Sequence, residues 1–159
     1  MPPTIATTES IAPHDADAVR AAIARVSHHI DRRRWPELRA LFADPVVVDY
    51  TSLFGGEIAT RSADDLIAGW RATLAPVPIT QHLLGPIDVV IRGDSAVAEC
   101  HVRGYHVRRG LRGGDEWMVA GHYVFELGKA GASWLIRKLT LETSYQTGNL
   151  ELLAQAAAA

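Results

Sequence analysis

The second half of the chain is a series of strand-like segments joined by short turns rich in glycine. We predict strands over Ile79–Leu84, Ile87–Arg92, Ser95–Arg109, Trp117–Leu127 and Ser133–Thr147. Short turns connect antiparallel neighbours, so this pattern predicts an antiparallel meander. Several of the segments exceed the usual five or six residues, and long strands must coil. We therefore expect a curved sheet whose concave face forms a pocket.

Helical patterns occupy the first half. The first helix should run from Asp15 to about Arg33, because apolar residues recur at spacings of four, three and four: Val19, Ile23, Val26 and Ile30. A second helix should begin at Pro36 and end at Asp44-Pro45. The β-branched segment Val46–Ser52 predicts a strand, with a short return strand after the glycine turn that follows it. Ser62 and Asp65 resemble a capping box that opens a third helix. Helices followed by strands predict an α+β domain.

The length of 159 residues is typical of one domain. Residues 1–14 are rich in Pro, Thr and Ser without an apolar period, so we predict a flexible N-terminal arm. Residues 15–148 should form the single domain. Residues 149–159 are an Ala-rich tail, either a short helix over the open end of the sheet or disordered.

Charge and cysteine content argue against several classes of protein. The net charge is −2 and the pI is about 6.4, so no strong field of one sign would attract nucleic acid or a membrane surface. The single Cys100 cannot form an internal disulfide, and the N-terminal segment lacks the pattern of a signal peptide. No apolar run approaches the roughly 18 residues that span a bilayer. We expect a cytoplasmic protein.

The two faces of Ser95–Arg109 differ, because side chains alternate along a strand. One face carries small or apolar residues and then His106, whereas the other carries Glu99, His101 and Arg103. His106 should therefore point into the concave side. A histidine among small apolar neighbours is either a core residue with its hydrogen bonds satisfied or a catalytic one.

Three more residues are candidates, although each has a structural explanation of its own. His82 lies in a strand, and Tyr50 shares a face with Val46 and Val48, so its hydroxyl needs a hydrogen-bond partner or a ligand. Asp31 lies about 100° around the helix from Ile30, at the edge of the apolar stripe.

The combination of these candidates resembles a known family. Four segments carry the resemblance, in order: Ile30–Trp35, Val48–Leu53, Thr80–Gly85 and Gly104–His106. Together they resemble the scytalone dehydratase-like branch of the NTF2-like (SnoaL-like) superfamily, over roughly residues 15 to 147. The resemblance implies a cone-shaped barrel, with N-terminal helices packed on a strongly curved antiparallel or mixed sheet that encloses a pocket.

The resemblance also implies chemistry without a cofactor, on a small hydrophobic or aromatic substrate that contains a carbonyl group. Asp31, Tyr50, His82 and His106 match the family's catalytic positions, whereas Ile30 replaces a tyrosine that precedes the acid. The pocket should be lined by Leu53, Phe54, Trp70, Trp117 and Val119.

Acid–base chemistry is consistent with these residue types. An imidazole can remove a proton next to a carbonyl and return it to a leaving hydroxyl, while a carboxylate fixes the tautomer and a phenol stabilises the enolate. We therefore expect a dehydratase-like lyase acting on a small aromatic or polycyclic hydroxy-ketone. Two alternatives stay open: an isomerase or cyclase of the ketosteroid-isomerase or polyketide-cyclase type, and a non-catalytic ligand-binding or assembly domain.

The faces on which residues lie also bear on metal binding and on self-association. His28 and His29 diverge on a helix, and His101 and His106 lie on opposite faces of a strand, so we expect no metal site. The outer face of the sheet should carry Val97, Tyr105 and Val107, which favours a homodimer or homotrimer.

Overall fold

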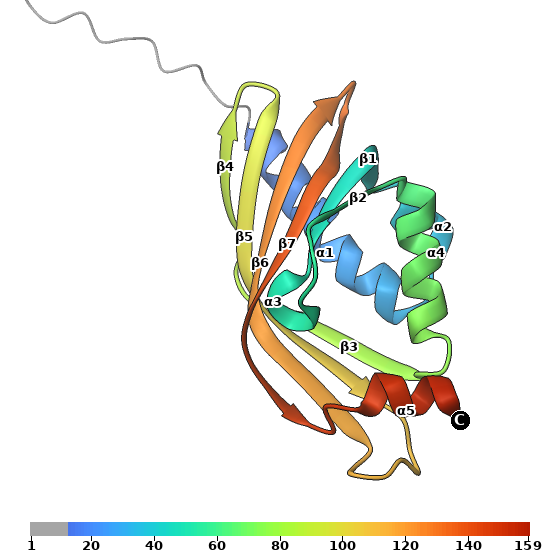
Figure 1. The fold of residues 1–159 in the computed structure, drawn as a ribbon. Helices are drawn as coiled ribbons and strands as arrows, with labels where there is room; N and C mark the ends of the chain where they lie inside the picture. Colours follow the sequence, from blue (N-terminus) through green and yellow to red (C-terminus); the bar gives the residue numbers. More distant parts are fainter. Residues whose placement is uncertain (1–12) are drawn as a thin grey trace, which may run out of the picture.

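The fold is an α+β arrangement in which N-terminal helices pack on one curved sheet (Figure 1). A computed structural model describes residues 13–159, so most of the predicted N-terminal arm lies outside the described residues. The helices are α1 (Pro13–Asp31), α2 (Trp35–Arg39), α3 (Thr51–Phe54), α4 (Ala63–Leu74) and α5 (Leu152–Ala158). The strands are β1 (Phe42–Asp49), β2 (Ala59–Arg61), β3 (Ile79–Leu84), β4 (Asp88–Arg92), β5 (Ser95–Val107), β6 (Glu116–Ala130) and β7 (Ser133–Gly148).

The sheet is mixed, and it does not close into the expected barrel. Its strands follow the order β2-β1-β7-β6-β5-β3, and β4 pairs with β5 outside this path. β1 runs parallel to β7, whereas the other pairs are antiparallel. The prediction of a simple meander was wrong at β3 and β4, because β5 is long enough to pair with both. β3 pairs with its C-terminal half and β4 with its N-terminal half.

The predicted second helix is shorter than expected. It ends at Arg39, and Phe42 and Asp44-Pro45 belong to strand β1 instead. The register of β1 against β7 shifts between Phe42 and Val47, so Pro45 lies where the pairing is irregular. Proline is tolerated at such irregular positions because no ladder hydrogen bond is required of it.

The predicted strand Val46–Ser52 ends earlier, at Asp49. The Asp49 carboxylate accepts hydrogen bonds from the backbone N–H and the hydroxyl of Thr51, at 3.0 and 2.7 Å. Aspartate commonly turns the chain in this way. The chain then forms the short helix α3. The return strand β2 and the Ser62 cap of α4 are confirmed, since Ser62 Oγ accepts from Asp65 N–H at 3.0 Å.

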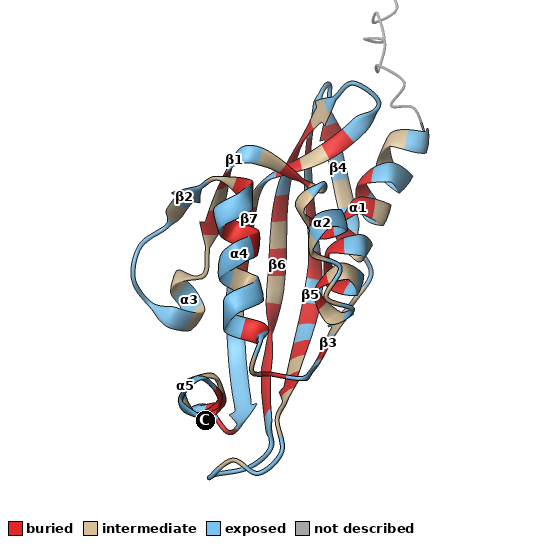
Figure 2. Ribbon diagram, turned by 90° about the vertical axis from the view of Figure 1, so that its right-hand side faces the viewer, coloured by how far each residue is buried: buried red, intermediate tan, exposed pale blue. Residues whose placement is uncertain are grey.

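The core lies between the helices and the concave face of the sheet, and buried residues alternate with exposed ones along much of β5 (Figure 2). The four apolar residues predicted for the inner face of α1 are all buried: Val19, Ile23, Val26 and Ile30. No helix within residues 13–159 is long and apolar enough to span a bilayer.

The C-terminal tail is a helix rather than a disordered segment. Leu152 and Ala156 of α5 are buried, and Arg108 donates a hydrogen bond to the carbonyl of Ala156 at 3.1 Å. The buried Asn149 anchors the start of α5. Its amide donates to the carbonyls of Arg112 and Gly114, at 3.1 and 2.9 Å, in the β5–β6 connection.

We expect Asn149→Ala to lower the free energy of unfolding by about 1–3 kcal/mol, because two carbonyls lose their donor. Amide hydrogen exchange should rise in α5 and in the β5–β6 connection and stay unchanged in α1. Denaturant unfolding and exchange measured by mass spectrometry check this. If the amide hydrogens of α5 exchange at the same rate in the variant and in the wild type, Asn149 does not anchor the helix.

Candidate active site

A largely apolar pocket of about 110 Å³ lies between the sheet and helices α3, α4 and α5. All five predicted pocket residues line it: Leu53, Phe54, Trp70, Trp117 and Val119. Three of the four predicted catalytic residues also line it, namely Tyr50, His82 and His106. The remaining wall comes from Ile30, Thr73, Leu74, Val102, Gly104, Tyr123, Leu141 and Leu153.

Asp31 lies behind His82 rather than in the pocket wall. As the last residue of α1, it places its carboxylate against the edge strand β3. Asp31 Oδ1 is 2.7 Å from His82 Nδ1, and Asp31 Oδ2 accepts the backbone N–H of His82 at 2.7 Å. An ionised carboxylate can only accept, so the contact favours the His82 tautomer protonated at Nδ1, with Nε2 free.

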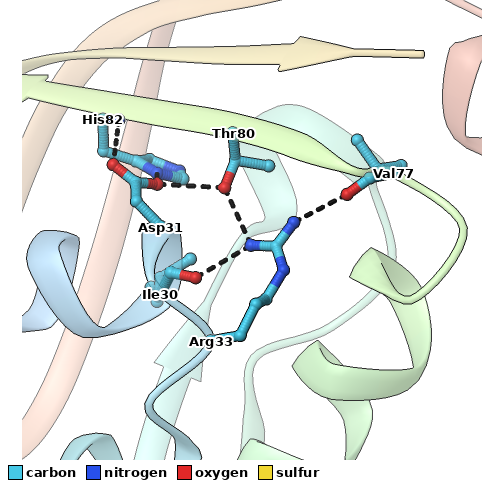
Figure 3. A network of polar contacts seen from close by, with 6 residues as sticks. All are labelled: Ile30, Asp31, Arg33, Val77, Thr80 and His82. Atoms are coloured by element: carbon cyan, nitrogen blue, oxygen red, sulfur yellow. Dashed lines mark hydrogen bonds and ion pairs between the residues drawn. The ribbon is translucent and has the colours of Figure 1, made fainter.

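Thr80 and Arg33 extend this contact into a network (Figure 3). The Thr80 hydroxyl donates to Asp31 Oδ1 at 3.0 Å and accepts from Arg33 Nη1 at 2.8 Å. Burial alone would raise the pKa of Asp31. The hydrogen bonds and charge of His82, with the bond from Thr80, outweigh burial and hold that pKa below its usual value.

His106 points into the pocket as its position on β5 predicted, and it is buried. Its ring centroid is 5.6 Å from that of His82 and 4.7 Å from that of Trp117. Burial lowers the pKa of His106 to about 4, and the neighbouring His82 contributes to the shift. The ring is therefore neutral at neutral pH. Its Nδ1 is buried without a hydrogen-bond partner among the described residues.

Gly104 makes room for both imidazoles. It lies opposite His82 in the β3–β5 pairing. A Cβ atom at this position would lie 3.1 Å from Cδ2 and 3.2 Å from Nε2 of His82, and 3.6 Å from Cε1 of His106. Such contacts to His82 are closer than ordinary van der Waals distances. The His82 ring can therefore take its position because residue 104 is glycine and has no side chain.

Two tyrosines face the pocket, although only Tyr50 was predicted. Burial raises the pKa of Tyr50 well above its usual value, and the neighbouring Tyr123 phenol adds to the effect. Burial raises the pKa of Tyr123 as well. Both phenols therefore remain protonated and can donate hydrogen bonds.

Sequence reasoning missed Tyr123, Thr80 and Arg33. Strand alternation could have indicated Tyr123, which is two residues from the buried Phe125 on the inner face of β6. Thr80 could have been suspected because it shares a face of β3 with His82. No local signal identifies Arg33, whose hydrogen-bond partners Val77 and Thr80 lie more than 40 residues away.

The other histidines do not enter the pocket. His101 and His122 pair across strands β5 and β6 on the outer face, with ring centroids 4.3 Å apart. Within residues 13–159, no group of three or more His, Cys, Asp or Glu side chains is placed to hold a metal ion.

This fold and pocket define a known class of domain. The model of the SnoaL-like domain family matches residues 13–140, and the chain belongs to that family. No curated protein matches the chain by sequence.

Three solved structures illustrate the similarity. The Kfla4162 protein from Kribbella flavida is 27% identical, with a TM-score of 0.84 over 89% of this chain and 97% of that chain. The "Putative Scytalone Dehydratase" from Novosphingobium aromaticivorans DSM 12444 is 20% identical, with a TM-score of 0.74 over 86% and 88%. A "Hexachlorocyclohexane dehydrochlorinase (LinA) Type2" is 17% identical, with a TM-score of 0.69 over 86% and 89%. The last two comparisons show a shared fold.

We expect the stability of the protein to fall as the pH drops from about 6.5 to about 4, because His106 is harder to protonate when folded than when unfolded. The unfolded chain binds the proton first, so the His106 contribution is complete above pH 6.5. It is lost through this window, by up to about 3 kcal/mol.

Denaturant unfolding of wild type and His106→Gln at several pH values checks this, since the variant should lose stability less steeply in that window. Parallel pH dependence in the two proteins would show that His106 is not the titrating group.

Proposed function

We propose that this protein is a cofactor-independent acid–base lyase that eliminates water next to the carbonyl group of a small, uncharged hydroxy-ketone. The observation that carries the proposal is the 2.7 Å contact between Asp31 Oδ1 and His82 Nδ1. It holds an oriented imidazole in the wall of a pocket that His106 and Tyr50 also line. A carboxylate, an imidazole and a phenol in this relation suit proton abstraction beside a carbonyl.

His82 is the base in this scheme. Its Nε2 accepts the proton from the carbon next to the carbonyl, while Asp31 stabilises the imidazolium that forms. Tyr50 donates a hydrogen bond to the carbonyl oxygen as negative charge develops there. The proton then passes to the hydroxyl on the neighbouring carbon, the carbon–oxygen bond breaks, and water leaves as the carbon–carbon double bond forms. In this scheme His106, neutral at neutral pH, orients the leaving hydroxyl.

The lining of the pocket supports an uncharged substrate. The described residues that form its wall include no lysine, arginine, aspartate or glutamate. A charged group would lose its hydration there without gaining a partner of opposite charge. The volume of about 110 Å³ is smaller than that of an apolar cavity of about 150 Å³ that holds benzene, which favours a small ligand over a polycyclic one.

Two of the similar structures support elimination chemistry by analogy. One is named a "Putative Scytalone Dehydratase" and the other a dehydrochlorinase. Fold similarity alone does not establish an activity, so this support is secondary to the geometry of His82 and Asp31.

The proposal predicts that Asp31→Asn and His82→Gln lower kcat/KM by on the order of 10²–10⁴-fold, because each removes part of the oriented base. A panel of uncharged, single-ring hydroxy-ketones should be tested, with formation of the conjugated ketone followed by absorbance and loss of water by mass. Asp88→Asn is the matched control, because Asp88 is exposed on β4. Activity of Asp31→Asn within about threefold of wild type would refute the role of Asp31.

The products distinguish the alternatives. A product with the mass of the substrate and a shifted double bond would show an isomerase and contradict water elimination. A tightly bound ligand recovered unchanged after long incubation would instead favour a binding domain.

We also expect Gly104→Ala to lower kcat/KM by about tenfold or more, because the added Cβ would displace the Nε2 edge of His82. Gly69→Ala on α4 is a suitable control, since a Cβ there meets no atom within 4 Å. Thermal unfolding of Gly104→Ala should change little, so the loss would separate ring position from fold stability. Full activity in Gly104→Ala would contradict the placement of the base at His82 Nε2.

A further inference from the structure

We propose that Thr80 and Arg33 are positioning residues that hold the Asp31 carboxylate in its ionised form and in the orientation that His82 requires. This inference rests on the proposed function, because it assigns to that same site a supporting layer outside the pocket. Neither residue is part of the pocket wall, so neither contacts a ligand held there.

The Thr80 hydroxyl has only one proton to donate. Arg33 Nη1 donates to the hydroxyl oxygen at 2.8 Å, and a guanidinium is a donor only. The single Thr80 proton is therefore directed to Asp31 Oδ1, 3.0 Å away. Because Thr80 is buried, water does not compete readily for this hydroxyl. Arg33 in this way fixes the direction of the Thr80 hydroxyl without contacting Asp31 itself.

Asp31 Oδ1 consequently receives two hydrogen bonds, from Thr80 and from His82 Nδ1, while Oδ2 receives the backbone N–H of His82. These contacts fix the plane of the carboxylate. Each of them stabilises the charged form over the protonated form. Removal of the Thr80 bond should therefore make Asp31 easier to protonate and free to rotate away from His82 Nδ1.

The guanidinium of Arg33 is itself held firmly. Besides Thr80, it donates to the carbonyl of Ile30 through Nη1 at 2.8 Å and to the carbonyl of Val77 through Nη2 at 2.7 Å. These bonds join the end of α1 to the segment before β3, as Figure 3 shows. The planar fork of arginine can meet several acceptors at once, which lysine cannot reproduce.

The backbone of Arg33 is the second observation. Its φ is 56°, and among the described residues it is the one non-glycine residue with a positive φ. Such a conformation costs of order 1–3 kcal/mol and persists where surrounding contacts enforce it, often beside functional sites. Here it turns the chain directly after Asp31, so that the Arg33 side chain returns to β3. Glycine would adopt this backbone more easily but would supply no guanidinium.

The test uses Thr80→Val, which keeps the shape of the side chain and removes the hydroxyl. Arg33 Nη1 retains the Ile30 carbonyl as acceptor in this variant. Carbon-13 NMR of the Asp31 carboxyl group, with pH titration, should show a higher pKa for Asp31 in Thr80→Val than in wild type. Thr80→Ser keeps the hydroxyl and should restore the wild-type titration. Thr140→Val, a change on the outer face of β7, is the matched control.

Arg33→Gly tests the other half of the proposal, because glycine suits the positive φ and removes the guanidinium. We expect it to raise the Asp31 pKa in the same direction as Thr80→Val. With an identified substrate, both variants should lower kcat by on the order of tenfold, the worth of one hydrogen bond to a charged group, with KM within about twofold of wild type.

The NMR comparison needs no substrate, so the two proposals can fail separately. An Asp31 titration that is identical in wild type, Thr80→Val and Thr80→Ser would overturn the positioning role of Thr80, whatever the activity. An unchanged titration in Arg33→Gly would overturn that of Arg33. Absence of turnover in every hydroxy-ketone tested would instead overturn the proposed function, and the titrations would still decide the positioning role.

Discussion

The carboxylate of Asp31 joins the end of helix α1 to strand β3, and the site depends on this contact. β3 is an edge strand, paired on one side with β5. On the other side, where residues 13–159 supply no strand, the Asp31 carboxylate accepts the backbone N–H of His82, and it also binds the His82 ring. One side chain therefore provides a hydrogen-bond acceptor for a backbone N–H of the edge strand and also orients the imidazole. An unpaired edge N–H is costly to bury, which gives the contact a structural purpose as well.

The apolar surroundings of the pocket set the ionisation states of the groups within it. Burial lowers the pKa of His106 and raises those of Tyr50 and Tyr123, so these three groups are neutral near pH 7. The Asp31 carboxylate keeps its charge, and it lies behind His82, outside the pocket wall. Electrostatic interactions in such a site are stronger than in water, so a developing enolate would be stabilised effectively by a nearby phenol.

The length of β5 determines which residues lie close together in the site. β5 is long enough to pair with β4 at one end and with β3 at the other, so His82 and Gly104 become cross-strand neighbours. The small side chain of Gly104 then lets the His82 and His106 rings approach at 5.6 Å between centroids. The sequence predicted five strands in this half of the chain but placed them in one meander, because turn chemistry identifies where strands end and not which strands pair. For the same reason, local sequence pattern could not predict the parallel pairing of β1 with β7.

By itself, the sequence determined the amphipathic face of α1, the capped start of α4 and the inward direction of His106, because helix and strand periodicities are local properties of the backbone. Residue pattern and the family resemblance together also placed Tyr50, His82 and five apolar residues around one pocket. Only the tertiary structure decided that Asp31 binds His82 rather than His106, that Tyr123 contributes a second phenol, and that Arg33 reaches Thr80. These relations join residues far apart in the chain, and they follow from strand order and register, which depend on the packing of the whole domain.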